Sequence, residues 1–358
     1  MTFQNSAKSG VSNGVKAKGN WLHRIVWTAV CLAIALVSGA VTIIVRGPKS
    51  SQTMRYVATI EVPPAKGLVS GTDYALVHDH ELYVAYSSAD SLLKISPELA
   101  SVQFLARNLD GIHGVSFSSD SRLAFVSAGK AGKMVVLEMP QATPIKRVDA
   151  GTNPDGIVFD RKLNMAYTGA GESKSATLVS AADLEHPTTI ALGGSPEFPQ
   201  VDEATGLIYQ PLEDTNEVVV VDPLLKKVVS RFAVSPCEGP KGSAIDAARK
   251  VLYVGCSNQM LIVMDLAGGH ILASVPIGRF VDVVGWDPGL HRIYSANSAG
   301  SMTVIQQSEH GTYRVIDTVQ TRAGGHTLAV DAETHRVYVV CSRLRGAQIL
   351  VYEPRSAS

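Results

Sequence analysis

The sequence predicts an all-β protein, a seven-bladed β-propeller preceded by one transmembrane or signal helix. A local pattern of short apolar strands and polar turns occurs seven times, and each copy carries an aromatic residue at the same place in its second strand. These marker residues are Tyr83, Phe125, Tyr167, Tyr209, Tyr253, Tyr294 and Tyr338, at intervals of 42, 42, 42, 44, 41 and 44 residues. A period near 40 with about four strands per unit is typical of propeller blades, whereas helical solenoids show apolar residues spaced by three and four.

The last copy, His326 to Glu353, indicates how the ring closes. Its apolar residues alternate as three short strands with turns near Asp331 and Gly346, and no fourth strand fits before Ser358. A single strand without a blade of its own, Arg55 to Val62, precedes the first copy. We predict that this strand is the outer strand of the last blade, which leaves no blade edge open.

The residues before the propeller divide into three segments. Residues 1–24 are polar and basic and are expected to form a disordered tail. Residues 25–45 carry no charge and, as a helix, are long enough to cross about 30 Å of hydrocarbon. Residues 46–54 have the composition of a polar linker, and residues 55–358 contain the propeller.

The apolar segment has two interpretations. Its length and the long polar stretch before it favour an uncleaved transmembrane anchor, with a small excess of basic residues predicting that the N-terminus lies inside. The alternative is a signal peptide that is cleaved after Ala40, where Ser38-Gly39-Ala40 has suitably small residues. Either interpretation places the propeller outside the cytoplasm, in a periplasmic or extracellular location.

The charge distribution excludes one class of partner. The chain has 358 residues and a formal net charge of zero, but its first 50 residues carry six Lys or Arg and no acid. The remaining residues therefore hold 26 basic and 32 acidic side chains. Because a mildly acidic exported domain does not attract a phosphate backbone, we expect no nucleic-acid partner. Membrane contact is expected through the uncharged residues 25–45.

Two of the four cysteines are placed for a disulfide. Cys256 ends the second strand of the fifth blade, and Cys237 lies in the loop that leads into its first strand. In an antiparallel sheet the end of the second strand lies beside the start of the first, so these two cysteines are candidates for a disulfide in an oxidising compartment. The alternative is two unlinked thiols, because the sequence does not give the distance between their Cα atoms. Cys31 belongs to the apolar segment, and Cys341 has no evident partner.

The second strands carry a family resemblance. Three copies read Tyr253-Val-Gly-Cys, Tyr338-Val-Val-Cys and Tyr83-Val-Ala-Tyr, and this pattern resembles the YVTN-type β-propeller repeat of surface-layer and other exported proteins. The resemblance covers residues 55–358 and implies a binding or scaffold protein of unknown ligand. Related propellers include lactone hydrolases and the heavy chains of quinoprotein dehydrogenases, so the fold does not by itself determine the chemistry.

Two series of equivalent residues have different expected roles. The seven aromatic markers are expected to fill the space between blades. A second series precedes the first-strand turn of each blade by a constant distance, and every member is ionisable: Asp73, His113, Asp155, Glu197, Lys241, Asp282 and His326. Because the first strand is innermost, these side chains are predicted to surround one mouth of the central channel.

The mouth residues are candidate ligand-binding residues. The alternative is that they are only the polar lining that any water-filled channel needs. Four of them come from successive blades and have the oxygen and nitrogen donors that a divalent metal ion accepts: Asp73, His113, Asp155 and Glu197.

Two function classes are compatible with these patterns. The first is a non-catalytic propeller that binds a protein, glycan or small molecule through its loop face and channel mouth. The second is a propeller hydrolase similar to the lactonases, with a metal ion at the mouth. We expect the first, because residues 55–358 have no Gly-x-Ser-x-Gly elbow, no phosphate-binding loop before a helix and no His-Glu-x-x-His pair. A divalent metal ion is the one cofactor that the residues suggest.

Overall fold

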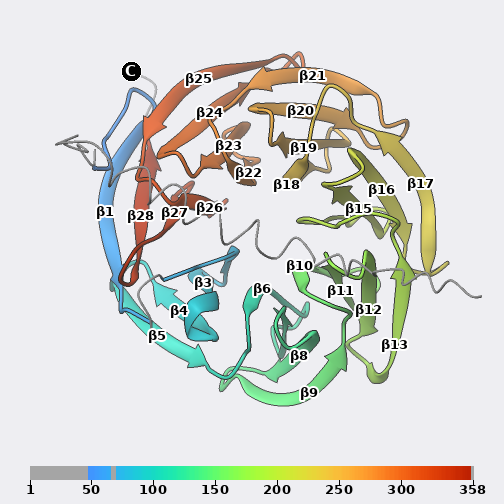
Figure 1. Ribbon diagram of the computed structural model, residues 1–358. Helices are drawn as coiled ribbons and strands as arrows, with labels where there is room; N and C mark the ends of the chain where they lie inside the picture. Colours follow the sequence, from blue (N-terminus) through green and yellow to red (C-terminus); the bar gives the residue numbers. More distant parts are fainter. Residues whose placement is uncertain (1–46, 66–69, 356–358) are drawn as a thin grey trace, which may run out of the picture. The chain divides into compact units, whose positions relative to one another are not determined.

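The computed structural model describes residues 47–65 and 70–355, which form seven four-stranded antiparallel sheets around a central channel (Figure 1). The predicted number of blades is therefore confirmed. The tail and the apolar segment, residues 1–45, lie outside the described residues. Within the described ranges, no helix is both long enough and apolar enough to span a membrane.

Each sheet has four strands in the order inner, second, third and outer. The inner strands are β2 (Ala75–His78), β6 (Ile112–Phe117), β10 (Pro154–Asp160), β14 (Gln200–Asp202), β18 (Pro240–Asp246), β22 (Val281–Asp287) and β26 (Gly325–Val330). The second strands are β3 (Glu81–Tyr86), β7 (Leu123–Ala128), β11 (Met165–Ala170), β15 (Leu207–Leu212), β19 (Val251–Cys256), β23 (Arg292–Asn297) and β27 (Val337–Ser342). The third strands are β4 (Ser91–Ser96), β8 (Lys133–Glu138), β12 (Ser175–Ser180), β16 (Glu217–Asp222), β20 (Met260–Asp265), β24 (Ser301–Gln307) and β28 (Ala347–Pro354). The outer strands are β5 (Ser101–Ala106), β9 (Thr143–Asp149), β13 (Asp183–Ala191), β17 (Lys227–Ala233), β21 (Ile271–Pro276), β25 (Tyr313–Gln320) and β1 (Met54–Val62).

The position of a strand in its blade determines its residue pattern. The third strand β16 is packed between two neighbouring blades, and its four valines, 218–221, are all buried. The outer strand β17 faces solvent on one side, and its residues alternate between partly buried and exposed. A strand buried on both faces needs a continuous apolar run, whereas a half-exposed strand needs an alternating one.

The ring closes as predicted. Strand β1 pairs antiparallel with β28, from Met54 opposite Pro354 to Val62 opposite Ala347, and so completes the blade of β26, β27 and β28 (Figure 1). The strand begins one residue earlier than the sequence suggested. Residues 47–53, predicted as a linker, pack against β25, because the amide and hydroxyl of Thr53 both donate to Asp317 Oδ2 at 3.0 and 2.8 Å.

The aromatic markers pack between blades, as expected. Tyr167, Tyr253 and Tyr294 are fully buried, and the most exposed marker, Tyr83, is 5% exposed. The Tyr253 ring lies 5.2 Å from that of Trp286 in the next blade. Large flat side chains thus fill the wedge between neighbouring sheets, which is a structural role.

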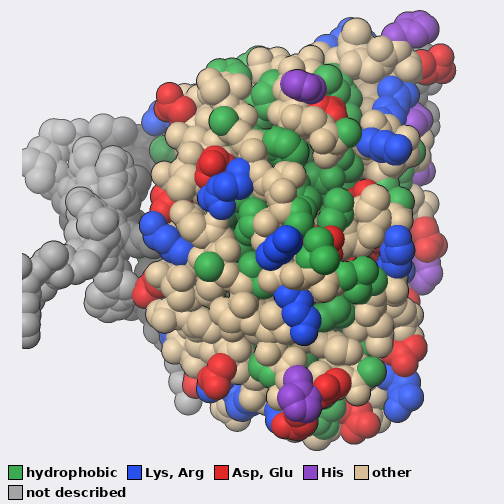
Figure 2. Space-filling view, turned by 90° about the vertical axis from the view of Figure 1, so that its right-hand side faces the viewer, with side chains coloured by type: hydrophobic (Ala, Val, Ile, Leu, Met, Phe, Trp, Pro, Cys, Tyr) green, Lys and Arg blue, Asp and Glu red, His purple; other side chains and the backbone are tan. Residues whose placement is uncertain are grey.

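Hydrophobic side chains also occur on the outside of the ring. Figure 2 shows the side that carries β13 and β17, where basic and acidic side chains are scattered among hydrophobic and uncharged ones. In the turn between β16 and β17, Leu224 and Leu225 are 70% and 59% exposed. On the side shown, the Lys and Arg side chains do not gather into one continuous patch.

The Cys237–Cys256 disulfide is present, with 5.4 Å between the two Cα atoms, and Cys341 is a buried free thiol. The bond closes a loop with a sequence separation of 19 residues next to β18.

The Cys237→Ala/Cys256→Ala variant is expected to lose about 3 kcal/mol of unfolding free energy, because the unfolded chain regains the entropy of that loop. Urea unfolding checks this value. The protein with native cysteines should be destabilised by reductant, whereas the variant should not respond to it; equal responses would contradict the prediction.

Candidate functional site at the channel mouth

One end of the central channel is surrounded by ionisable side chains, one from the start of the innermost part of each blade. Related blades bring equivalent residues to the same height, so this ring follows from the repeat. We call the set the mouth ring: Asp73, His113, Asp155, Glu197, Lys241, Asp282 and His326. Each member interacts electrostatically with the next around the whole circle. Glu197 is buried, and the other six side chains belong to partly exposed residues.

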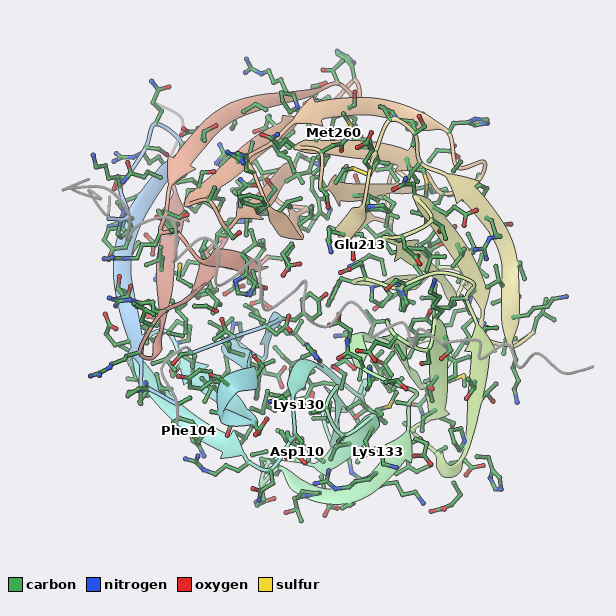
Figure 3. All side chains as sticks on the ribbon, in the orientation of Figure 1. Phe104, Asp110, Lys130, Lys133, Glu213 and Met260 are labelled. Atoms are coloured by element: carbon green, nitrogen blue, oxygen red, sulfur yellow. A yellow bond between two sulfur atoms is a disulfide. The ribbon has the colours of Figure 1, made fainter. Side chains whose placement is uncertain are left out.

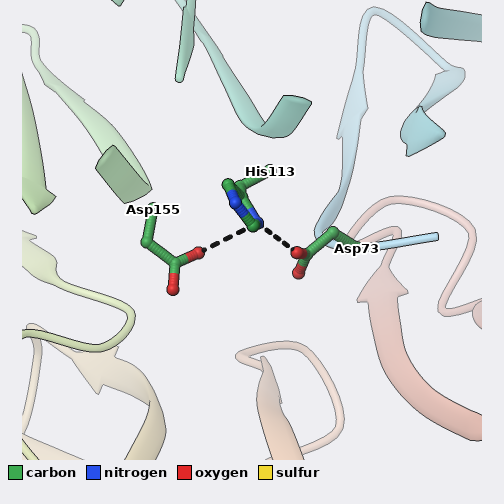
Figure 4. Close-up of side chains that lie close together, drawn as sticks. All are labelled: Asp73, His113 and Asp155. Carbon is green, nitrogen blue, oxygen red and sulfur yellow. Dashed lines mark hydrogen bonds and ion pairs between the residues drawn. The ribbon is translucent and has the colours of Figure 1, made fainter. Parts of the chain in front are cut away.

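Three members of the mouth ring form a compact cluster (Figure 4). His113 Nδ1 lies 2.5 Å from Asp73 Oδ2 and 3.6 Å from Asp155 Oδ1. One donor atom from each residue lies within 4.8 Å of the other two. Two carboxylate oxygens and one imidazole nitrogen are a donor set that first-row divalent metal ions accept.

The same geometry favours a proton on His113. Burial by itself would lower the pKa of this imidazole, but attraction by Asp155 and Asp73, and hydrogen bonds with Asp73 and Asn153, raise the pKa to about 9. The folded pKa is thus higher than the usual 6.5. The ion pairs of His113 therefore stabilise the fold fully below about pH 6.5, and this stabilisation is lost as the pH rises through about 9.

Glu197, predicted as a fourth metal ligand, belongs to a different part of the ring. Lys241 Nζ lies 3.0 Å from Glu197 Oε1 and also pairs with Glu213. Burial raises the pKa of Glu197, and the Lys241 ammonium offsets part of that rise. Burial would lower the pKa of Lys241, but Glu197 and Glu213 raise it above its usual range. Because the Lys241 ammonium already pairs with Glu197, we restrict the candidate metal site to Asp73, His113 and Asp155.

The remaining members complete the circle between Lys241 and Asp73. His326 Nδ1 lies 3.0 Å from the carbonyl oxygen of Gly324, and Nε2 lies 3.1 Å from that of Thr72. Carbonyl oxygens only accept, so an imidazole that donates to both carries two protons. Burial would lower the pKa of His326, but the carboxylates of Asp282 and Asp73 raise it, which agrees with this cationic form.

Two aromatic rings pack against each other next to the mouth ring. The Tyr74 and Phe198 rings pack with their centroids 4.6 Å apart. Burial raises the pKa of the Tyr74 hydroxyl, and the nearby carboxylates of Asp155, Glu197 and Asp73 raise it further. Blades that contribute glycine at the equivalent position make room for these rings. A Cβ on Gly156 would lie 2.9 Å from the Phe198 Cα, closer than such atoms approach in proteins.

Sequence reasoning did not identify Glu213, Tyr74 or Phe198 as mouth residues. Glu213 follows β15 and lies near the channel (Figure 3), although it is not part of the repeated series. Tyr74 and Phe198 each follow a ring member directly, where other blades have Gly114, Gly156 or Gly242. This exchange of large and small residues at one repeat position was the available signal.

No protein-family model matches this sequence, and no curated protein matches it. Solved structures do share the fold. A chain of the mitotic checkpoint complex superposes with a TM-score of 0.71 at 13% identity, over 88% of this chain and 95% of that chain. The WD40 β-propeller domain of Doa1 gives 0.68 at 13% identity, over 85% and 98%. A chain of Kuenenia stuttgartiensis hydrazine synthase gives 0.67 at 13% identity, over 76% and 92%.

Identities this low show a common propeller fold and nothing about chemistry. The seven-bladed propeller is thereby supported, whereas no family model supports the YVTN-type repeat in particular.

Proposed function

We propose that this protein is a YVTN-type binding and scaffold propeller outside the cytoplasm, held at a membrane by residues 25–45, and that its channel mouth binds a divalent cation. The observation that carries the cation site is the cluster of Asp73, His113 and Asp155, whose donor atoms lie within 4.8 Å of one another. The three side chains are 21%, 22% and 16% exposed, so the cluster is held in place and still reachable from solvent.

The charge of the mouth supports a cationic ligand. Five carboxylates, those of the mouth ring and Glu213, face three cationic side chains, so the formal charge is −2 when all are ionised. In the ion-free protein, the proton on His113 Nδ1 lies between two carboxylates. A metal ion bound by the same three donors would take the place of that proton.

Titration with Zn²⁺ and Mn²⁺ tests the site. At pH 7 we expect one ion to bind per chain and to release about one proton, because His113 must lose its proton before Nδ1 becomes a ligand. Calorimetry in buffers of different ionisation enthalpy measures that release.

The Asp155→Asn variant should bind at least about tenfold more weakly, since it loses a charged ligand. Because His113 has a pKa of about 9, affinity should rise as the pH increases toward that value.

A matched control distinguishes the cluster from general surface charge. Asp149 is 88% exposed on the outer strand β9, and Asp149→Asn should leave ion binding unchanged. Equal losses in the two variants, or binding without proton release, would contradict the proposal.

A second candidate function is metal-assisted lactone hydrolysis. It is favoured by the same cluster, because a divalent ion at a channel mouth can polarise a carbonyl group. A panel of lactones assayed with and without chelator separates the two functions. Hydrolysis that depends on the metal ion and is lost in Asp155→Asn would favour the hydrolase over the binding module.

The location outside the cytoplasm rests on the apolar segment and on the Cys237–Cys256 pair. Disulfides persist in oxidising compartments and are rare in the cytosol. Thiol labelling of the protein in intact cells, followed by denaturation, should find these two cysteines oxidised. Full labelling of both would count against an exported propeller.

A further inference from the structure

The channel contains a cavity whose wall includes Tyr74 and Phe198 but none of the mouth-ring residues. Its volume is about 440 Å³, within the range of pockets that hold small organic molecules. It is lined by the apolar residues that come four positions after the mouth residues in the sequence: Val77, Phe117, Phe159, Val201 and Ile245. The two halves of the channel thus have opposite chemistry.

Aromatic side chains dominate the walls of this cavity. Tyr74, Phe117, Phe159 and Phe198 all line it. His78 is stacked on Phe117, with parallel rings and 4.1 Å between their centroids. Aromatic walls favour a flat ring system, which can pack by offset stacking or edge to face.

One buried polar group in the wall lacks a partner. The Ser116 residue is 5% exposed and lines the cavity, and its hydroxyl makes no hydrogen bond with any described residue. A buried hydroxyl without a partner is energetically unfavourable, so native proteins usually provide one. A ligand with a single polar atom would supply that partner.

The rim of the cavity does not favour either sign of charge. Arg161 and Glu203 both line the cavity, and their side chains pair with each other at 3.7 Å. Each is 59% exposed, so the pair stays hydrated. The cation and the anion compensate each other, which leaves apolar contact as the main source of affinity.

We propose that this cavity binds a small, uncharged, ring-containing molecule that carries one hydrogen-bonding group for Ser116. The aromatic walls, the volume, the paired rim charges and the unpartnered hydroxyl each point to this class. The site is separate from the mouth ring and does not depend on the cation that the mouth is proposed to bind.

The probe for this proposal is N-phenyl-1-naphthylamine, an uncharged dye with linked aromatic rings that fluoresces in apolar surroundings. Titration of the propeller should give saturable binding of one dye per chain. The Val201→Trp/Ile245→Trp variant should reduce affinity at least tenfold, because the new side chains fill the cavity. Trp286 occupies the equivalent position in another blade, so the fold accepts tryptophan there.

Tryptophan substitutions outside the cavity serve as controls for the loss of dye binding. Val229→Trp adds the same ring on the outer strand β17, at a residue that is 39% exposed, and should not change dye binding. If the double variant fails to fold, Ala247→Trp at the rim replaces it, with its exposed neighbour Ala248→Trp as control. Zn²⁺ binding at the mouth should be unchanged in all these variants.

Three results would overturn the proposal: no saturable dye binding, equal effects of cavity and control variants, or tighter binding of the anionic dye 1-anilinonaphthalene-8-sulfonate. The last result would show that the ligand class is anionic.

Discussion

A chain that begins at Pro63, and therefore lacks β1, will lose cooperative folding. Strand β1 contributes Met54, Ile60 and Val62 to the core, each at most 4% exposed. Loss of one such side chain costs about 2–5 kcal/mol, and three together approach the whole stability of a typical domain, about 5–15 kcal/mol. The deletion also exposes the backbone edge of β28. Thermal unfolding followed by circular dichroism measures the loss.

The matched comparison is a chain that begins at Gly47 and keeps β1. A point variant tests the same strand without truncation: Ile60→Asp places a charge in the core, whereas Ala58→Asp places one at an exposed position of β1. Similar unfolding temperatures for Ile60→Asp and Ala58→Asp would show that β1 does not hold the ring closed.

The Lys241→Met variant is expected to lose about 3–5 kcal/mol at pH 7, because removal of one partner leaves buried charges uncompensated. Lys241 is the cation between Glu197 and Glu213, and its side chain is 16% exposed. Urea unfolding at several pH values measures the effect. Burial raises the pKa of Glu197 above its unfolded value, so the variant should be most stable at low pH and lose stability as the pH rises.

Two further variants test whether the stability lost in Lys241→Met comes from buried charge. Lys174 pairs with Asp214 at 2.7 Å, but its side chain is 54% exposed, so Lys174→Met should cost less than about 1 kcal/mol. Adding Glu197→Gln to Lys241→Met should restore part of the loss, because one buried charge disappears. A loss that is the same at every pH would mean that packing of the lysine stem, and not charge, is responsible.

Much of the propeller could be predicted from the sequence because the governing signals are local and repeated. The seven aromatic markers gave the number of blades, and one orphan strand, residues 55–62, gave the closure that β1 and β28 make. The Cys237–Cys256 pair followed from the antiparallel order of strands within one blade. Each of these features depends on which strand is adjacent to which, and not on exact distances.

Which residues surround the channel could be predicted from the repeat, since seven equivalent positions must lie at one height. Their pairing could not: in the folded chain His113 lies with Asp73 and Asp155, while Glu197 lies with Lys241. These partners come from different blades, about 40 residues apart in the chain, so their pairing depends on how neighbouring blades pack and not on a local pattern. The contact between the Tyr74 and Phe198 rings could not be predicted either, because it joins side chains from separate blades.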